Sequence, residues 1–505
     1  MITIDGESLS IQDVVRVSRY GEPVGLSDAA IPGIERSRDF VREIVREHRV
    51  VYGITTGVGE LSNSLIPPED AEQLQVNLIR SHAVNVGEPF PEDVVRAIIL
   101  LRANALAKGF SGVRVRLIRS LLDLLNHRAC PYIPSKGSVG ASGDLSPLSH
   151  LALVLIGEGE CMENGNRVRS RDVLEKKGIA PLRLKPKEGL ALINGTQVMA
   201  ALGCLVAEEA GLLMKNAQIA GAMSLEALKG TSKAFDEKVH GVRPHAGQVR
   251  CAETMRRLVH DSAIIASHVN CEKVQDAYTL RCIPQVYGAI MDTLDYVKGI
   301  LEVEINSATD NPLIFPDEGE VISGGNFHGE PLAFAMDYLG IALSEIGNIS
   351  ERTLDRLINP HVSGLPPFLV KKSGINTGFM ITQYTAAALV SENKVFAHPA
   401  SVDSIPTSAG QEDHVSMGTI SARHAWEILK NTENVLAIEM LAAAQGIDFH
   451  DLEPGTGTKA AHAKIRAHVS HVENDRVLYQ DVETIRELMI RGKLVKRVEE
   501  AIGPM

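Results

Sequence analysis

Four consecutive residues, Ala141-Ser142-Gly143-Asp144, have the types needed to build a reactive group from the chain itself. The amide nitrogen of Gly143 can attack the carbonyl carbon of Ala141 and close a five-membered ring, because glycine has no Cβ to hold the backbone apart. Loss of water from this ring and from the Ser142 side chain leaves a methylene conjugated to a carbonyl, which is an electrophile. The alternative is a Gly/Ser-rich turn that caps a helix.

The elements around this tetrapeptide are mainly helices, so the predicted fold class is mainly α. Apolar residues recur with the helical period. The pattern predicts helices over residues 34–48, 68–84, 91–107, 113–126, 197–228, 286–304, 327–356, 378–393, 414–445 and 481–500. Strand patterns are short and cover residues 1–4, 49–52 and a hairpin over 313–322. Helices of such length are typical of extended bundles, in which neighbours cover each apolar face.

Loops hold nearly every unusual residue combination, and they cover residues 53–64, 131–143, 310–325, 364–377 and 401–413. Binding residues often lie on loops that a rigid scaffold holds. A soft boundary near residue 200 separates a loop-rich N-terminal region, 1–200, from a long-helix bundle, 201–505. Nothing between them resembles a linker, so we expect the two regions to pack as one body.

The composition excludes several classes of protein. The chain has 505 residues and a formal net charge of −12, and no stripe of Lys and Arg with interleaved aromatics indicates nucleic-acid binding. The N-terminus has no basic and apolar segments of a signal peptide. The apolar range 197–228 is interrupted by residues such as Glu208, Glu209, Lys215 and Asn216, so it predicts a buried helix and not a membrane span.

Cysteines and histidines give no metal-binding pattern. The six cysteines, at 130, 161, 204, 251, 271 and 282, are scattered without a CxxC pair, which favours reduced thiols and a cytoplasmic location. Cys282 is read as a packed thiol, with a nucleophile as the alternative. His240 and His245, and the group His462, His468 and His471, lack a metal-ligand frame, so no metal site is predicted.

Eight segments, in order, resemble those of one family, the aromatic amino-acid ammonia-lyases. They are YGITTGVG at 52–59, NLIRSH at 77–82, GSVGASGDLSPLSH at 137–150, GLALINGTQ at 189–197, KVQDAYTLRCIPQ at 273–285, NSATDNP at 306–312, GGNFHGEP at 324–331 and SIPTSAGQEDHVSM at 404–417. The resemblance covers roughly residues 1–490 and is closest to the histidine-specific members.

The resemblance implies the chemistry and the cofactor. Family members cyclise the tripeptide that matches Ala141-Ser142-Gly143 into 4-methylidene-imidazole-5-one (MIO), and they use no external cofactor. The implied reaction releases ammonia from L-histidine, as in histidine degradation, and forms trans-urocanate. The implied assembly is a homotetramer whose sites draw on several chains.

Catalytic roles also follow from the resemblance. Tyr52 matches the usual candidate base; as a base its pKa must be lowered, since a normal phenol is protonated at pH 7. The alternative is a core tyrosine that hydrogen-bonds a neighbouring carbonyl. Asn194 matches a position near MIO, although an Asn-Gly-Thr that opens a helix also suits an N-cap. Arg281 is the candidate clamp for the substrate carboxylate, because its planar fork matches a carboxylate, and a structural salt bridge is the alternative.

Residues beside Arg281 and on the ring side of the substrate complete the predicted site. Gln275 and Tyr278 lie six and three residues before Arg281, so on a helix they would share its face and donate to MIO or substrate. His82 and Glu412 match positions that contact the imidazole, where a carboxylate can accept a ring N–H. Phe327 packs either on the substrate ring or in the core.

At two positions the sequence departs from the pattern of the histidine-specific members, so other functions stay open. Gly410 replaces a common asparagine and Gly329 a frequent alanine, and the segments at 327–330 and 420–423 resemble the tyrosine aminomutase branch. The alternatives are therefore a tyrosine ammonia-lyase or aminomutase, and a helical assembly protein that forms no MIO.

Overall fold

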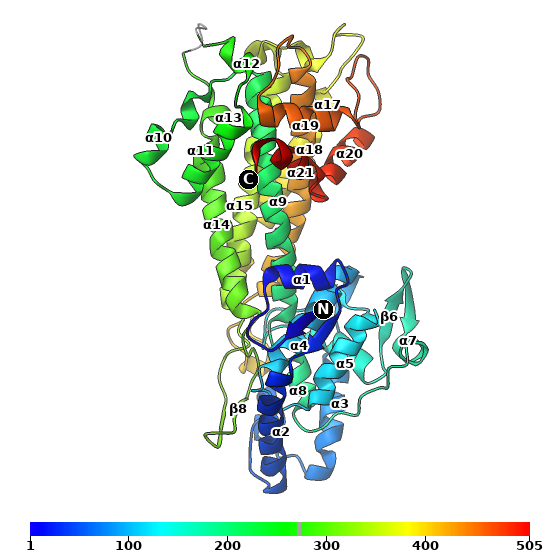
Figure 1. Cartoon of the computed structure of the whole chain (residues 1–505). Coiled ribbons are helices and arrows are strands. Elements are labelled where there is room, and N and C mark those ends of the chain that lie inside the picture. Colours follow the sequence, from blue (N-terminus) through cyan, green and yellow to red (C-terminus); the bar gives the residue numbers. More distant parts are fainter. Residues whose placement is uncertain (270–273) are drawn as a thin grey trace. The chain divides into compact units, whose positions relative to one another are not determined.

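The computed structural model describes residues 1–269 and 274–505, so Cys271 and Lys273, named above, lie outside the described residues. Helices dominate, as predicted (Figure 1). The chain divides into two compact units. The first comprises Met1–Glu208, Val297–Asp337 and Pro399–Arg423, and the second comprises Glu209–Tyr296, Tyr338–His398 and His424–Met505. The organisation into residues 1–200 and 201–505 stays a prediction.

The first unit is built around a buried helix, α4 (Glu92–Ala107), in which every residue from Val94 onward is buried. A helix that is apolar on most sides is typical of a core element, and α1 and α5 pack against it. The other helices of this unit are α1 (Ile11–Ser18), α2 (Ile31–Arg46), α3 (Ala71–His82), α5 (Val115–Asn126), α6 (Leu145–Leu155), α7 (Ser170–Lys176) and α8 (Glu188–Ile193).

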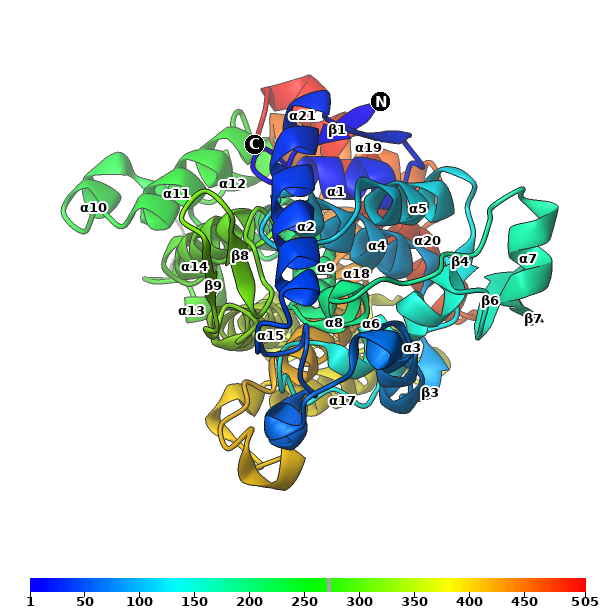
Figure 2. The same ribbon diagram turned by 90° about the horizontal axis from the view of Figure 1, so that it is seen from below.

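Short strands form four small sheets in the first unit. The strands are β1 (Ile2–Ile4), β2 (Val24–Leu26), β3 (Val86–Pro89), β4 (Cys130–Pro131), β5 (Pro134–Lys136), β6 (Glu160–Glu163), β7 (Asn166–Arg169), β8 (Leu313–Phe315) and β9 (Glu320–Ile322). The predicted hairpin is confirmed, with Leu313 opposite Ile322. Figure 2 shows it beside α2, where Ile314 joins a buried cluster with Val41, Ile44 and Ile54.

Four long helices contribute residues to both units: α9 (Gln197–Ala227), α14 (Ile283–Glu304), α15 (Glu330–Ile358) and α18 (Gly418–Ile447). Within the second unit they form a bundle. A Cβ on Gly221 would contact Ile283 of α14 at 3.0 Å, and Ser224 of α9 donates a 2.8 Å hydrogen bond to Glu439 of α18. The remaining helices are α10 (Glu237–Gly241), α11 (Ala246–Leu258), α12 (Ala263–Ala266), α13 (Tyr278–Arg281), α16 (Pro360–Ser363), α17 (Met380–Phe396), α19 (Thr456–Arg466), α20 (Tyr479–Ile490) and α21 (Lys493–Ile502).

Two helices, α9 and α15, are long and apolar enough to span a membrane by length and composition alone. Of their most apolar windows, 78% and 67% of the residues are buried inside the protein. Burial on this scale is typical of core helices, and it agrees with the prediction of a buried helix over residues 197–228.

Two predicted elements are wrong. Residues 49–52 form no strand, because the Thr55 hydroxyl accepts from the Val51 amide at 2.9 Å and donates to the Arg49 carbonyl at 2.7 Å. These bonds occupy backbone groups that a neighbouring strand would need. The helix predicted over 481–500 is interrupted at Gly492, whose φ of 65° lies in the left-handed region that glycine adopts readily.

Candidate active site

The tetrapeptide lies in a tight turn that leads into α6. Ser142 and Gly143 have φ angles of 49° and 78°, and the Gly143 amide donates to the Gly140 carbonyl at 3.1 Å. A Cβ on Gly143 would lie 2.2 Å from the Gly195 carbonyl oxygen, so only glycine fits. Two consecutive left-handed residues curl the chain here, and a cyclisation between the Gly143 nitrogen and the Ala141 carbonyl requires such a curl.

The carboxylate of Asp144 fixes the end of this turn. It is fully buried and accepts from the amides of Val198 and Met199 at 2.9 and 3.0 Å, at the start of α9. Its second oxygen accepts from the Thr419 hydroxyl at 2.5 Å, at the start of α18. Burial raises the pKa of Asp144 to about 6, although each of these hydrogen bonds favours the ionised form. Asp144 thereby joins the turn to the first turns of two long helices.

Asn194 lies beside the same turn but does not cap α9, so the N-cap alternative is wrong. The amides of Val198 and Met199 at the start of α9 donate to Asp144. Asn194 instead is the C-cap residue of α8. Its amide nitrogen donates to Asp310 Oδ1 at 3.2 Å and to the Asn311 carbonyl at 3.1 Å. Its side-chain oxygen is buried and has no hydrogen-bond partner among the described residues. Leaving a buried acceptor without a donor costs about 1–3 kcal/mol, which a hydrogen bond from a donor at the site would recover.

Tyr52, His82 and Glu412 lie close enough to interact electrostatically. Burial raises the pKa of Tyr52, and the Glu412 carboxylate raises it further. Burial lowers the pKa of His82, and the same carboxylate opposes that shift. His82 and Glu412, the predicted contacts of the imidazole, and Tyr52, the predicted base, therefore lie near one another. The Glu412 side chain is held by the Thr407 hydroxyl at 2.8 Å.

The Tyr52 hydroxyl differs from both sequence-based expectations. It accepts a 3.1 Å hydrogen bond from the Gly59 amide and is not bonded to a carbonyl among the described residues, so the core-tyrosine alternative is wrong. The Gly59 amide favours the phenolate, but burial and Glu412 outweigh it, and the pKa of Tyr52 is raised. The lowered pKa expected for a base is not found within this single chain.

Phe327 is half-buried in the loop before α15. This loop approaches the turn at 137–144 through Ser416: a Cβ on Gly140 would lie 2.2 Å from the Ser416 Oγ, and a Cβ on Gly329 3.1 Å from it. The same Cβ on Gly329 would lie 2.4 Å from the Met199 sulfur, which explains why glycine stands there in this chain. Gly410, the other departure, has a φ of 91° that glycine and asparagine tolerate better than most residues.

Gln275, Tyr278 and Arg281 belong to the second unit. The Arg281 guanidinium lies over the Tyr278 ring, 4.6 Å from its centroid, and both residues belong to α13, a single helical turn. Gln275 precedes this helix in irregular backbone, so the expectation that it shares their helical face is wrong. In the described part of the chain Arg281 makes no ion pair, and its buried Nε has no hydrogen-bond partner. The salt-bridge alternative is therefore not observed there.

Sequence reasoning missed residues that hold the site from distant segments. Lys187 and Asp310 form a fully buried ion pair at 2.8 Å, and Asp310 in turn holds Asn194. Arg102 is also fully buried and donates to the Asn194 carbonyl at 2.7 Å. Asp310 lies inside a matched segment, NSATDNP, and was therefore detectable. Lys187 and Arg102 carry no sequence signal, because only the fold brings them to this place.

Comparisons with known proteins fit this geometry. The family model for aromatic amino acid lyases matches residues 9–467. A protein of Alkaliphilus oremlandii named histidine ammonia-lyase is 56% identical over 99% of both chains. The crystal structure of histidine ammonia-lyase from Trypanosoma cruzi superposes with a TM-score of 0.92 at 44% identity, covering 99% of this chain and 95% of that one. The tyrosine aminomutase of Streptomyces globisporus superposes with a TM-score of 0.95 at 39% identity, covering 100% and 99%.

A mainly helical fold with these matches defines a carbon–nitrogen lyase. The chain belongs to the aromatic amino acid lyase family. Membership confirms the predicted family, fold class and enzyme class. The roles of the individual site residues stay predictions.

Proposed function

We propose that this chain eliminates ammonia from L-histidine and forms trans-urocanate. The carrying observation is the position of Glu412, whose charge acts on both His82 and Tyr52. A carboxylate and an imidazole at one place suit a ring that both donates and accepts hydrogen bonds. Full-length similarity at 56% identity to a protein named histidine ammonia-lyase supports the same substrate.

We also propose that Ala141-Ser142-Gly143 forms MIO, with no external cofactor. The fit is supported by the left-handed φ angles of Ser142 and Gly143 and by the lack of space for any Cβ on Gly143. MIO supplies an electrophile that makes the substrate amine a better leaving group. Asp144 holds the turn, and the unpartnered oxygen of Asn194 is available to a donor at the site.

The proton chemistry is assigned to Tyr52. It removes the β-proton of the substrate, and the Gly59 amide stabilises the phenolate that this role needs. Since the pKa of Tyr52 is raised in the single chain, the base form becomes available at alkaline pH or once a positive group joins the site. Arg281 is assigned to the substrate carboxylate, with Tyr278 and Gln275 as donors to substrate or MIO, and Phe327 to the substrate ring.

The test is steady-state turnover of wild type and Ser142→Ala on histidine, tyrosine and phenylalanine. We expect wild type to prefer histidine and the variant, folded as judged by circular dichroism, to lose nearly all turnover. Wild-type-like turnover in the variant would refute the MIO assignment. A wild-type preference for tyrosine would refute the substrate assignment alone.

A second candidate is a tyrosine ammonia-lyase or aminomutase. It is supported by the structural similarity to the tyrosine aminomutase and by the segment Phe327-His328-Gly329-Glu330. Product analysis after incubation with tyrosine separates a tyrosine aminomutase from a tyrosine ammonia-lyase. The aminomutase forms a β-amino acid, whereas the lyase forms an acrylate.

The assembly is proposed to be a cytoplasmic homotetramer. In the second unit, an apolar groove of about 620 Å³ is lined by α14 and α15 residues that include Tyr296, Tyr338 and Ile341. These three side chains are 43–48% exposed, and a second copy of this chain would cover them. Light scattering of wild type and Ile341→Asp tests this: we expect a tetramer that dissociates in the variant, whereas a fully active wild-type monomer would contradict it.

A further inference from the structure

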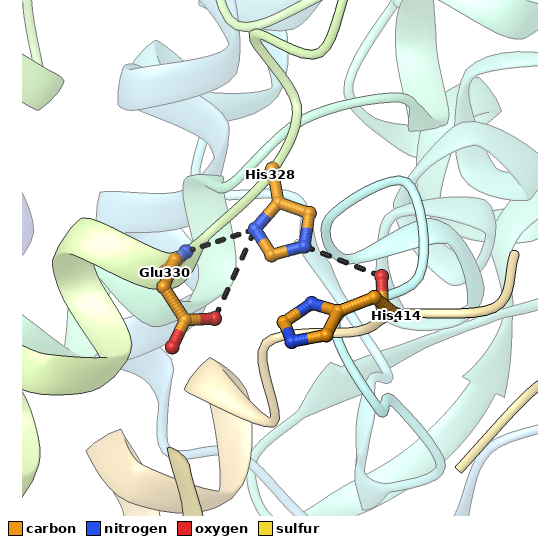
Figure 3. A group of neighbouring side chains, drawn as sticks. All are labelled: His328, Glu330 and His414. Atoms are coloured by element: carbon orange, nitrogen blue, oxygen red, sulfur yellow. Dashed lines mark hydrogen bonds and ion pairs between the residues drawn. The ribbon is translucent and has the colours of Figure 1, made fainter. Parts of the chain in front are cut away.

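A second cluster of chemically active side chains lies outside the assigned residues. His328, Glu330 and His414 each offer one ligand atom, and these atoms lie within 4.8 Å of one another (Figure 3). His328 and Glu330 stand at the start of α15, and His414 comes from the loop that also carries Glu412. His328 and His414 are 86 positions apart, so no spacing pattern in the sequence indicated this group.

The Glu330 carboxylate indicates that this cluster binds a ligand. Its Oε2 is shielded from solvent and has no hydrogen-bond partner among the described residues. A shielded carboxylate oxygen without a donor is costly, so it calls for a cation or a proton. The nearest polar atom of the cluster is His328 Nδ1, at 4.0 Å, which is too far for a hydrogen bond.

The two histidines are arranged so that each can turn a nitrogen toward Glu330. The His328 ring lies between the Glu330 amide, 3.3 Å from Nδ1, and the His414 carbonyl, 3.3 Å from Nε2. With the proton on Nε2, that nitrogen donates to the His414 carbonyl, which fixes the ring as in many metal sites. The lone pair of Nδ1 accepts the long 3.3 Å hydrogen bond from the Glu330 amide, and an ion bound at Nδ1 would replace this bond. In the described structure no hydrogen bond holds the His414 ring, which is exposed and stacks on His328 with centroids 5.6 Å apart.

We propose that His328, Glu330 and His414 bind a divalent transition-metal ion of the zinc type. Two imidazoles and one carboxylate form the ligand set of open zinc sites, and imidazole also suits Co²⁺ and Ni²⁺. Ligand bonds of about 2.1 Å in tetrahedral geometry place ligand atoms roughly 3.4 Å apart. The present spacing of up to 4.8 Å requires a closure of up to about 1.4 Å. Rotation of the unheld His414 ring moves its own nitrogen, and a small rotation of the Glu330 side chain would shorten the 4.0 Å separation from His328 Nδ1.

Binding would connect the start of α15 to the loop at 401–417. Phe327 directly precedes His328, and Glu412 lies two residues before His414. An ion at this place would therefore fix the backbone on both sides of the proposed substrate-ring contacts. This inference concerns metal binding and does not depend on which amino acid the enzyme accepts.

The test is titration of the metal-free, full-length protein with Co²⁺, followed by visible absorption and calorimetry. We expect about one saturable site per chain with a tetrahedral d–d spectrum, and at least roughly tenfold weaker binding in His328→Gln, His414→Gln and Glu330→Gln. The control is His468→Gln, an exposed histidine outside the cluster, which should bind like wild type. Melting temperature without metal shows whether each variant is folded.

Three results would overturn the proposal. They are an absence of saturable binding, binding that all three variants retain, and a thiolate-to-metal charge-transfer band. The last would assign the ion to a cysteine such as Cys282, the one half-buried thiol among the five described free cysteines. Unchanged binding in the Glu330→Gln variant alone would contradict the proposed ligand role of Glu330.

Discussion

Asp144 and Asp448 are both held by several hydrogen bonds, yet their pKa values move in opposite directions. In the first unit, Asp144 accepts from two amides and two hydroxyls, all uncharged, and burial raises its pKa to about 6. In the second unit, burial alone would raise the pKa of Asp448 as well. Hydrogen bonds from His462 and His471 and the charge of Arg466 instead lower it to about 2.

The difference follows from charge and from exposure. The Arg466 cation stabilises the ionised Asp448 by charge as well as by hydrogen bonding, and the Asp448 side chain is 15% exposed, whereas Asp144 is fully buried and has only neutral donors. The Asp448 cluster joins the end of α18 to α19 and the segment after it, and no predicted site residue belongs to it. Asp144 instead terminates the turn at 141–143. One carboxylate serves packing, and the other holds a turn in an unusual backbone conformation.

The largest expected effect comes from Asp144→Ala. It leaves the Val198 and Met199 amides and the Thr419 hydroxyl without their buried acceptor, at about 1–3 kcal/mol for each unpaired group. We expect a loss of about 3–5 kcal/mol in the free energy of unfolding by urea denaturation. The matched variant Asp144→Asn keeps an oxygen acceptor and should lose less than half as much. Equal losses would mean that charge, and not hydrogen bonding, holds the turn.

Asp448→Ala is expected to cost somewhat less. It leaves Arg466 and two histidines without their shared carboxylate, but the cluster is 15–28% exposed and water replaces part of the interaction. We predict a loss of about 2–3 kcal/mol in urea denaturation, with turnover per folded molecule unchanged. Glu453→Ala, which removes an exposed ion pair with Lys459, is the control and should stay within about 0.5 kcal/mol of wild type. A loss of turnover in folded Asp448→Ala would contradict the conclusion that Asp448 serves packing alone while Asp144 holds the turn of the site.

Glu412 extends the comparison to a carboxylate beside titratable groups. Glu412→Gln keeps the size but removes the charge near His82 and Tyr52. We expect kcat/KM for histidine to fall by about 1.5–3 kcal/mol of transition-state stabilisation, with MIO formation retained. Because the carboxylate raises the pKa of Tyr52, removing its charge lowers this pKa, and the ascending limb of the pH–rate profile, where the base loses its proton, should move to lower pH.

Arg281→Lys is the matched control for this substitution. A lysine lacks the planar fork, so it should weaken histidine, tyrosine and phenylalanine alike. Unchanged histidine kinetics in Glu412→Gln would disprove the contact with the imidazole and leave the tyrosine alternative in its place.

The smallest predicted effect is a difference in pH dependence. The folded pKa of Asp144, about 6, lies above its unfolded value near 3.8, so the folded protein binds the extra proton between these values. The stability difference between wild type and Asp144→Asn should therefore grow by about 2 kcal/mol as the pH falls from 7 to 4. Asp448 has a lowered pKa, so its contribution is present above about pH 4 and is lost only as the pH falls toward 2. A difference for Asp144 that shrinks in acid would reverse this assignment.

Sequence alone predicts the parts that depend on local pattern. The helix expected over residues 197–228 is α9, Gln197–Ala227, because a long apolar period specifies a buried helix. The strand at 49–52 failed because a single hydroxyl, that of Thr55, competes for the backbone. Gly492 was a sequence signal that the last predicted helix is interrupted, because glycine adopts the left-handed conformation readily.

The site depends more on contacts between distant segments. Tyr52, His82 and Glu412 were predicted from the family resemblance; the charge of Glu412 acts on the pKa values of the other two, and their roles stay predictions. Three of the donors to Asp144 lie 54, 55 and 275 positions away, and the Lys187–Asp310 pair spans 123 positions. No periodicity or spacing encodes such pairs, since only the folded chain brings them together.

The most direct test of the account is the intact mass of the purified chain, followed by the mass of the peptide that contains residues 137–150. We predict that wild type is lighter than its sequence mass by two water molecules and that the whole loss lies in this peptide. Ser142→Ala should lack the loss that requires the serine hydroxyl. A wild-type chain that turns over histidine at its full, unmodified mass would contradict the central claim that Ala141, Ser142 and Gly143 form the electrophile.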